Sequence, residues 1–214
     1  MQYFQYPEEA IEYLKSKDAK LAYAINYIGP IMRPLSPGLF PALMNSIVGQ
    51  QISSKAHATV WKRIVDAMGD ITPEKIANAD DAYLQSFGLS FRKVGYMKQA
   101  AESVLNGAID LEALNDKTDD EVCTALSTLP GIGVWTAEML MIFTMNRMNI
   151  LSYGDFAVRK GMRMLFRHRD MKKPLFEKYR RKFSPYASVA SLYFWAISSG
   201  AIPELTDPAV KKKK

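Results

Sequence analysis

The residues of this sequence whose types and spacing suit chemistry on a phosphorylated substrate are a glycine-rich turn, Pro130-Gly131-Ile132-Gly133, and a carboxylate, Asp155, which follows 22 positions after Gly133. A helix that begins beside two glycines presents backbone N–H groups that no side chain covers, and such a helix end binds anions such as phosphate. Asp155 stands at the start of a basic helix, whose dipole favours the ionised carboxylate. A carboxylate there can stabilise positive charge that develops on a substrate.

Each feature also has a purely structural interpretation. Glycine-rich turns are common between helices, and Asp is a frequent N-cap residue at a helix start. Capping and catalysis are compatible roles for Asp155, so other parts of the chain have to distinguish them.

Two predicted helices flank the turn. Residues 119–127 form the first, which Pro130 stops because a proline ring cannot continue the helical hydrogen bonds. Residues 134–146 form the second, which is apolar nearly all round and is therefore expected to be central and buried. After a loop at 146–156 comes a helix whose predicted outward face is basic. Its exposed cations are expected to be Arg159, Lys160, Arg163 and Arg167.

The other segments also favour helices. Apolar residues follow helical spacing at 7–28, 39–68, 94–105 and 186–199, short helices are expected near 72–87, and no convincing strand or internal repeat occurs, so we predict an all-α fold. Two amides, Gln50 and Gln51, interrupt the apolar face of the predicted helical segment 39–68. They are either surface groups or groups of a polar cleft. His57 has no second histidine nearby and is expected to be structural or exposed. Phe91 lies in a predicted loop, where it either folds back on the core or acts as a wedge in a base stack.

Composition limits the function classes. The chain has 214 residues, a formal net charge of +6 and one cysteine, Cys123, which excludes an internal disulfide, a four-cysteine zinc site and an iron–sulfur cluster held by four cysteines of this chain. No apolar run of about 18 residues suggests a membrane helix, and we expect an intracellular protein. Eleven Lys or Arg occur at 159–182 against two acids, which indicates either a polyanion-binding face or a solvated helix face. Residues 206–214 are expected to be a disordered tail.

The turn and the carboxylate together resemble the helix-hairpin-helix DNA glycosylase superfamily, in which a similar hairpin is followed at about this spacing by an essential Asp. The resemblance extends from about Leu39 to Gly200 and is specific at 129–137 and 153–161. Pro130 to Ala137 is similar to the pattern of the 3-methyladenine DNA glycosylase II branch, and so is Ile47 to Ser53. The resemblance implies a single two-lobed helical glycosylase domain over residues 1–214, with the hairpin at 127–137 and the active-site cleft between the lobes.

The resemblance also implies the type of reaction. Bifunctional members of the superfamily have a nucleophilic Lys two positions after the second hairpin glycine, where this chain has Trp135. Without that amine no Schiff base forms with the sugar. The expected activity is therefore monofunctional removal of flipped, alkylated purines from duplex DNA in base excision repair, which leaves an abasic site, with no abasic-site lyase activity.

By position in the family pattern, the resemblance assigns roles to individual residues. Asp155 would be catalytic, and Trp135, Met139 and Trp195 would form the base pocket, although Met139 replaces the aromatic residue of the best-known branch. The wedge would be Phe91, Leu89 or Ser90. The DNA contacts would come from Phe91, Gly131, Gly133, Val134, Thr136, Arg159 and Lys160.

No catalytic cofactor is implied. A structural Na⁺ or K⁺ would be held by the backbone carbonyls of Ser127, Leu129 and Ile132, and the protein would act as a monomer on damaged double-stranded DNA, in the cytoplasm and nucleoid or in a nucleus. Two alternatives stay open: a non-catalytic helix-hairpin-helix module that binds DNA, and a glycosylase for oxidised or deaminated bases.

Overall fold

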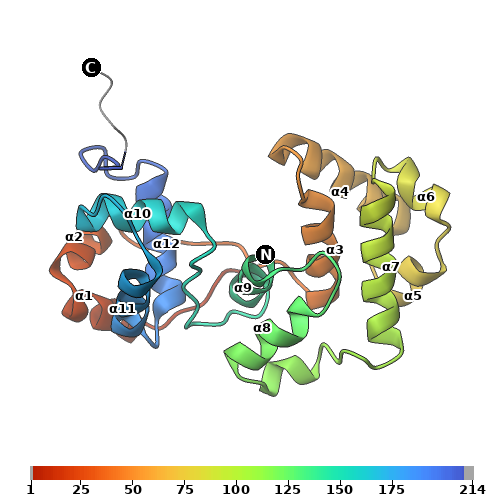
Figure 1. Ribbon diagram of the computed structural model, residues 1–214, viewed down its shortest axis with the longest axis horizontal. Helices are drawn as coiled ribbons and strands as arrows, with labels where there is room; N and C mark the ends of the chain where they lie inside the picture. Colours follow the sequence, from red (N-terminus) through yellow and green to blue (C-terminus); the bar gives the residue numbers. More distant parts are fainter. Residues whose placement is uncertain (1, 210–214) are drawn as a thin grey trace. The chain divides into compact units, whose positions relative to one another are not determined.

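The computed structural model describes residues 2–209 of the chain. Over these residues it contains twelve α-helices and one 3-10 helix and no strand, apart from an isolated β-bridge between Tyr3 and Pro34. The helices form two compact units, Met1–Leu35 with Asn146–Lys214 and Ser36–Met145 (Figure 1). The prediction of an all-α fold is confirmed. Within the described residues, no helix has both the length and the apolar character needed to cross a membrane.

The first unit is built around one buried helix. Its helices are α1 (Glu8–Lys17), α2 (Ala19–Ile28), α10 (Phe156–Phe166), α11 (Lys173–Phe183) and α12 (Ala187–Ser198). Helix α12 is apolar on every face, and it contacts all four of the others. A helix that is apolar all round can only be placed inside a core, so the sequence of α12 determines its central position.

Helices α10 and α12 approach closely at Gly161. A Cβ atom at this position would overlap the carbonyl oxygen of Phe194 in α12. The missing side chain therefore allows the two backbones to touch. Asp155 directly precedes α10, and Trp195 directly follows Phe194 in α12. The crossing therefore determines whether the Asp155 and Trp195 side chains come into contact.

Helix α11 was not expected from the sequence. Its many charged residues obscure the apolar pattern in the sequence, but the helix has an apolar face on which Phe176 and Phe183 are fully buried. Tyr179 stacks on Phe166 of α10 with ring centroids 4.2 Å apart and an interplanar angle of 15°. Tertiary aromatic packing thus stabilises a helix that is otherwise rich in charged side chains.

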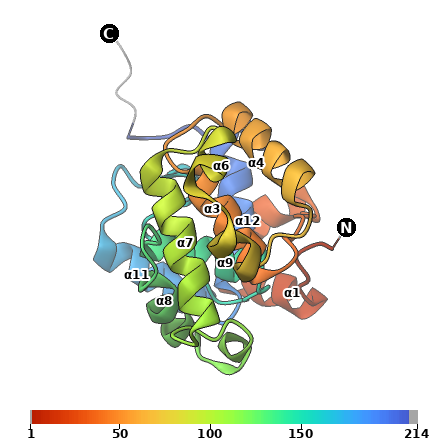
Figure 2. The ribbon, with the colours of Figure 1, turned by 90° about the vertical axis from the view of Figure 1, so that its right-hand side faces the viewer.

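The second unit contains the remaining helices. These are α3 (Leu39–Gly49), α4 (Ser54–Met68), α5 (Pro73–Asn78), α6 (Asp81–Ser86), α7 (Phe91–Leu105), the 3-10 helix η1 (Ala113–Asp116), α8 (Asp119–Ser127) and α9 (Val134–Phe143). Helix α7 lies beside α3 in both views (Figures 1 and 2), and α3 also contacts α4 and α9. Leu43, Met44 and Ile47 of α3 are fully buried. Helix α3 is therefore the core helix of this unit.

Three sequence-based expectations need correction in the second unit. Gln50 and Gln51 do not interrupt a helix but form the turn between α3 and α4, with Gln51 at a φ of 56°. Helix α7 begins at Phe91, three residues earlier than expected, because the Ser90 side chain accepts a hydrogen bond from the Lys93 N–H and caps it. Helix α9 is buried only from Ala137 onward, since its first turn is exposed.

The segment expected to be a disordered tail starts with ordered contacts. The carboxylate of Asp207 accepts two hydrogen bonds from Arg163, at 3.0 and 2.5 Å. The Thr206 carbonyl accepts a hydrogen bond from Arg167. Residues 206–209 are therefore placed on α10, and the Lys211–Lys214 part of the expected tail lies outside the described residues.

Candidate functional site

The hairpin between α8 and α9 depends on Gly131. Its φ is +81°, in the left-handed region where side chains are disfavoured. A Cβ atom there would also overlap the ring of Tyr96 on α7. Gly131 is thus required both for the backbone angle and for the close contact with the ring.

Gly133 has a different role from the one expected. Its φ of −92° and ψ of 171° are accessible to any residue, so no unusual backbone angle explains it. It is the N-cap of α9, no side chain caps that helix, and a Cβ atom at Gly133 would have nothing within 4 Å. Val134 and Trp135 are 58% and 50% exposed. The first turn of α9 is therefore open to an anion on its backbone N–H groups.

A pocket of about 580 Å³ lies beside the hairpin, within the second unit. It is lined by Ser46, Gly49, Gln50, Gln51, His57, Gly131, Trp135, Thr136 and Met139. The structure thus brings together Trp135 and Met139, two residues that the sequence assigned to a base pocket. An aromatic ring, a thioether and amide groups make a site that can hold a flat, polar-edged molecule.

Gln50 connects the α3–α4 turn to the hairpin. Its side-chain amide donates a hydrogen bond of 2.8 Å to the Gly131 carbonyl. The neighbouring Gln51 accepts a hydrogen bond of 3.2 Å from Arg92 of α7. From the sequence alone, the roles of these two amides stayed open. The sequence did contain one indication of the turn: two consecutive polar residues interrupt an apolar face, which is typical of a segment that leaves the helix.

His57 has a structural role. Its Nε2 lies 3.1 Å from the backbone carbonyl oxygen of Asn45, which can only accept, so Nε2 carries a proton. A Cβ atom at Gly49 would lie 2.8 Å from the imidazole ring, so the glycine makes space for it. Among the described residues, no group of three or more His, Cys, Asp or Glu side chains could hold a metal ion.

Asp155 accepts hydrogen bonds from Val158 and Trp195 in the first unit. It is 7% exposed and is the N-cap of α10. Its Oδ1 accepts a hydrogen bond of 2.8 Å from the Val158 N–H and one of 3.2 Å from the indole Nε1–H of Trp195. The predicted N-cap role is confirmed. A buried carboxylate at a helix N-terminus, with directed donors, is a fixed negative charge.

The predicted site residues therefore occur as two groups. Asp155 lies with Trp195 in the first unit, and Trp135 lies with Met139 beside the hairpin in the second. Trp195 was predicted as an aromatic wall for a base, but its N–H group is directed at the carboxylate. That contact could not be predicted, because it depends on how α10 and α12 cross.

The predicted basic face of α10 needs one correction. Arg163 is not outside: it is 9% exposed and paired with Asp207. The hydrogen bonds from Arg163 lower the pKa of the Asp207 carboxyl, and the same contact raises the pKa of the guanidinium. Lys160 donates a hydrogen bond to the Ser198 carbonyl. Arg159 lies 5.0 Å from the Tyr153 ring, and its buried Nε has no hydrogen-bond partner.

Phe91 is the exposed member of the three wedge candidates. It is 78% exposed at the start of α7, whereas Leu89 is 6% exposed and belongs to the core. Ser90 is engaged as the α7 N-cap. The adjacent Lys93 donates a hydrogen bond to the Val48 carbonyl, and burial lowers the pKa of its ammonium group.

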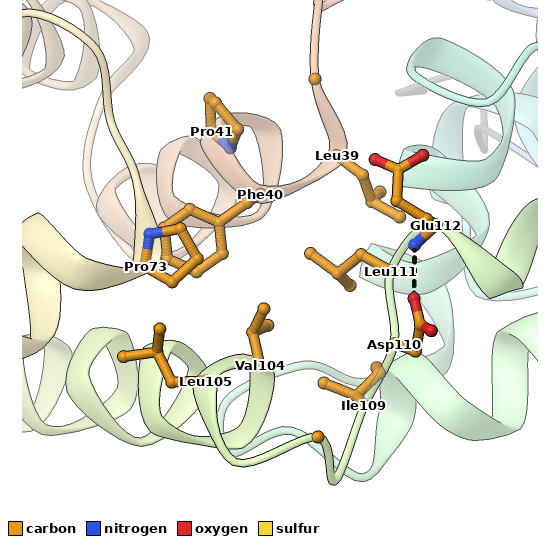
Figure 3. Close-up of a pocket in the computed structure, with 12 residues that line it drawn as sticks. Leu39, Phe40, Pro41, Pro73, Val104, Leu105, Ile109, Asp110, Leu111 and Glu112 are labelled. Carbon is orange, nitrogen blue, oxygen red and sulfur yellow. Dashed lines mark hydrogen bonds between the residues drawn. The ribbon is translucent and has the colours of Figure 1, made fainter.

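The second unit contains another pocket, of about 540 Å³, whose lining is mostly apolar (Figure 3). Apolar side chains form most of its lining: Phe40, Pro73 and Val104 come from α3, α5 and α7, and Ile109 and Leu111 come from the segment after α7. Its Asp110 accepts hydrogen bonds from the backbone N–H groups of Glu112 and Ala113. That carboxylate therefore organises a turn, and we do not assign catalysis to this pocket.

The comparisons with known proteins agree with this geometry. Residues 44–185 match the family described as HhH-GPD superfamily base excision DNA repair protein. A crystal structure of DNA-3-methyladenine glycosidase from Bacillus halodurans is 30% identical, covers 95% of each chain and has a TM-score of 0.86. A Schizosaccharomyces pombe 3-methyladenine DNA glycosylase in complex with abasic DNA is 27% identical, covers 89% of this chain and 97% of its own, and has a TM-score of 0.77.

Among curated proteins, DNA-3-methyladenine glycosylase 1 of Schizosaccharomyces pombe is 29% identical over 179 residues, which are 81% of this chain and 78% of that protein.

Proposed function

We propose that this chain, which belongs to the HhH-GPD superfamily of base excision DNA repair proteins, is a DNA glycosylase that removes alkylated purines of the 3-methyladenine type from duplex DNA. The observation that carries the proposal is Asp155, a buried carboxylate held at a helix N-terminus by two donors to one oxygen. The names of the relatives support the substrate class.

The reaction breaks the bond between the purine and the sugar C1′ atom. Alkylation at N3 of adenine or N7 of guanine gives the base a positive charge, so it leaves with the bonding electrons as a neutral molecule. The sugar then carries oxocarbenium-like positive charge, which the Asp155 carboxylate stabilises. Water adds to C1′ and loses a proton, which Asp155 can accept. The products are a free base and an abasic site.

The damaged base must leave the stacked duplex before it reacts, because its bond to the sugar is not accessible inside the helix. We assign Trp135 and Met139 to the pocket for the flipped base, since a cation over an aromatic face gains roughly 0.5–2 kcal/mol. Phe91 is our candidate for the wedge that fills the gap.

The hairpin is assigned to the DNA backbone. The N–H groups of the exposed first turn of α9 suit a phosphate. The guanidinium group of the half-buried Arg159 is a candidate donor to a phosphate of the same strand. We also retain a structural Na⁺ or K⁺ on the carbonyls of Ser127, Leu129 and Ile132. The Leu129 carbonyl accepts the Ile132 N–H at 3.0 Å, and its second lone pair suits a cation. Because DNA is the proposed substrate, we propose that the protein acts in the cytoplasm and nucleoid, or in a nucleus.

Trp135 determines the outcome of the reaction at the sugar. Its indole cannot form a Schiff base, so we expect an abasic site and no strand cleavage. Borohydride treatment of the protein on damaged duplex tests this expectation. A covalent protein–DNA adduct would contradict it.

Base release decides the function as a whole. The substrates are duplexes that contain 3-methyladenine, 7-methylguanine, ethenoadenine, hypoxanthine, uracil or 8-oxoguanine, and we expect release of the two methylated purines. Asp155→Asn should lower the single-turnover release rate by roughly 100-fold or more and retain DNA binding. Asp170→Asn, the same change at an exposed position, is the control. If Asp155→Asn releases these bases at the wild-type rate, Asp155 has no catalytic role and the mechanism is wrong.

A further inference from the structure

The indole N–H of Trp195 donates to the same carboxylate oxygen of Asp155 that caps α10. The two donors come from different helices: Val158 from α10 and Trp195 from α12. Rotation about the last side-chain bond of an Asp is soft, with broad energy wells. A single hydrogen bond constrains the distance from Oδ1 to one donor and leaves some rotation of the carboxylate, whereas a second donor from another direction removes that rotation.

Trp195 is itself held rigidly enough to do this. Helix α12 is buried along most of its length, and at Gly161 it touches the backbone of α10. On its N-terminal side, Ser188 accepts a hydrogen bond of 2.8 Å from the Ile150 N–H, which attaches α12 to the loop that leads to Asp155. Ser191 donates to the Ile150 carbonyl at 3.2 Å. The helix that carries the donor and the loop that carries the acceptor are thus tied together.

We propose that Trp195 is a positioning residue, which acts on base release by orienting the Asp155 carboxylate through its indole N–H, and not chiefly as an aromatic wall for the base. The proposal rests on the proposed function, because it needs Asp155 to be the catalytic carboxylate. Electrostatic stabilisation is effective when the charge is oriented before the reaction, so that no reorganisation is needed in the transition state. Loss of the donor should therefore slow the reaction and leave DNA binding unchanged.

An isosteric replacement separates the N–H group from the aromatic ring. Benzothienylalanine at position 195 replaces the indole N–H by sulfur and keeps both fused rings, so it preserves packing and stacking. We expect its single-turnover release of 7-methylguanine at saturating protein to fall roughly 10-fold or more, as for loss of a partner that orients a reactive group. The release rate of Trp195→Phe should fall by at least as much. The same two replacements at Trp61 of α4, in the other unit, are the controls and should leave the rate unchanged.

Two further measurements distinguish positioning from stacking. The first is a double-mutant cycle: in an Asp155→Asn background, Trp195→Phe should cause no additional loss, because its effect passes through the carboxylate. The second compares binding of duplexes with a cationic pyrrolidine abasic analogue and with a neutral tetrahydrofuran analogue. The isostere should lose preference for the cationic analogue and bind the neutral one as tightly as the wild type.

The outcomes are distinguishable. If Asp155→Asn abolishes base release but the isostere reacts at the wild-type rate, the positioning role is wrong and the catalytic role of Asp155 stands. An equal loss from Trp195→Phe with and without Asp155 would instead identify the ring as a stacking surface. If Asp155→Asn leaves release unchanged, it is the proposed function that fails.

Discussion

Gly131 and Gly133 occupy equivalent-looking places in the sequence but meet different physical demands. Gly131 has a left-handed backbone angle and sits against the Tyr96 ring, whereas Gly133 is extended and faces open space. The first glycine is therefore needed for folding of the hairpin. The second leaves space for a ligand that approaches the exposed N–H groups of α9.

This difference predicts opposite results for two identical substitutions. Gly131→Ala should lower the free energy of unfolding by about 1–3 kcal/mol, because the left-handed angle is strained and the methyl group overlaps Tyr96. Gly133→Ala should change it by less than about 0.5 kcal/mol and weaken binding to duplex DNA. Urea unfolding and DNA titrations of both variants test this. Equal destabilisation by the two would contradict the assignment.

At the scale of elements, much of the secondary structure could be predicted, because apolar spacing and caps are local signals. Helix α8 begins and ends where expected, and Thr118 and Glu121 form a capping box at its start. Helix α11 was missed because its stability comes from stacking on Phe166, which lies on another helix. The pairing of Arg163 with Asp207 was missed for the same reason. A residue with a distant partner carries no signal in a local pattern.

The crossing of α10 and α12 gives a prediction about an element. Gly161→Ala should be strongly destabilising, by about 3 kcal/mol or more, because the new methyl group overlaps backbone of α12 and cannot be relieved by rotation of a side chain. Gly95→Ala in α7 is the matched control. Its Cβ would lie 3.8 Å from Gln99, so it should gain about 0.5–1 kcal/mol from helix propensity.

Chemical denaturation of both glycine variants measures these changes. The rate of base release is a second measurement. Because the crossing sets the contact between Trp195 and Asp155, the folded fraction of Gly161→Ala should bind DNA but release bases more slowly than the wild type. A Gly161→Ala protein as stable as the wild type would show that α10 and α12 do not need this close approach.

At the scale of the whole molecule, the sequence indicated candidate site residues more readily than the residues that surround them. Asp155, Trp135 and Met139 were predicted as site residues from motifs, since a family pattern preserves spacing, and these assignments stay predictions. The position of Gln50 and Gln51 in the lining of the pocket beside the hairpin was not predicted, because these residues are more than 80 positions before Trp135 and meet it only through the fold. Net charge likewise suggested a polyanion partner but did not say which of the 28 basic residues would touch it.

The location of the charge, and not its total, should govern DNA affinity. The affinity of a protein for duplex DNA falls with salt, with a logarithmic slope of about −0.9 for each phosphate that it neutralises. Arg159 has a buried Nε without a partner and lies next to the loop of Asp155, whereas Lys15 on α1 is paired with Glu12. Arg159→Gln and Lys15→Gln both reduce the formal net charge from +6 to +5, by subtraction of one cation.

We expect Arg159→Gln to weaken binding of an abasic duplex and to reduce the steepness of the salt dependence by about one unit, and Lys15→Gln to leave both unchanged. Titrations of labelled duplex at several salt concentrations measure the two slopes. If both variants lose the same affinity, DNA is attracted by the net positive charge of the whole molecule, and Arg159 is not a specific phosphate ligand. If only Arg159→Gln changes the slope, the start of α10 supplies both the carboxylate for the sugar and a cation for its phosphate.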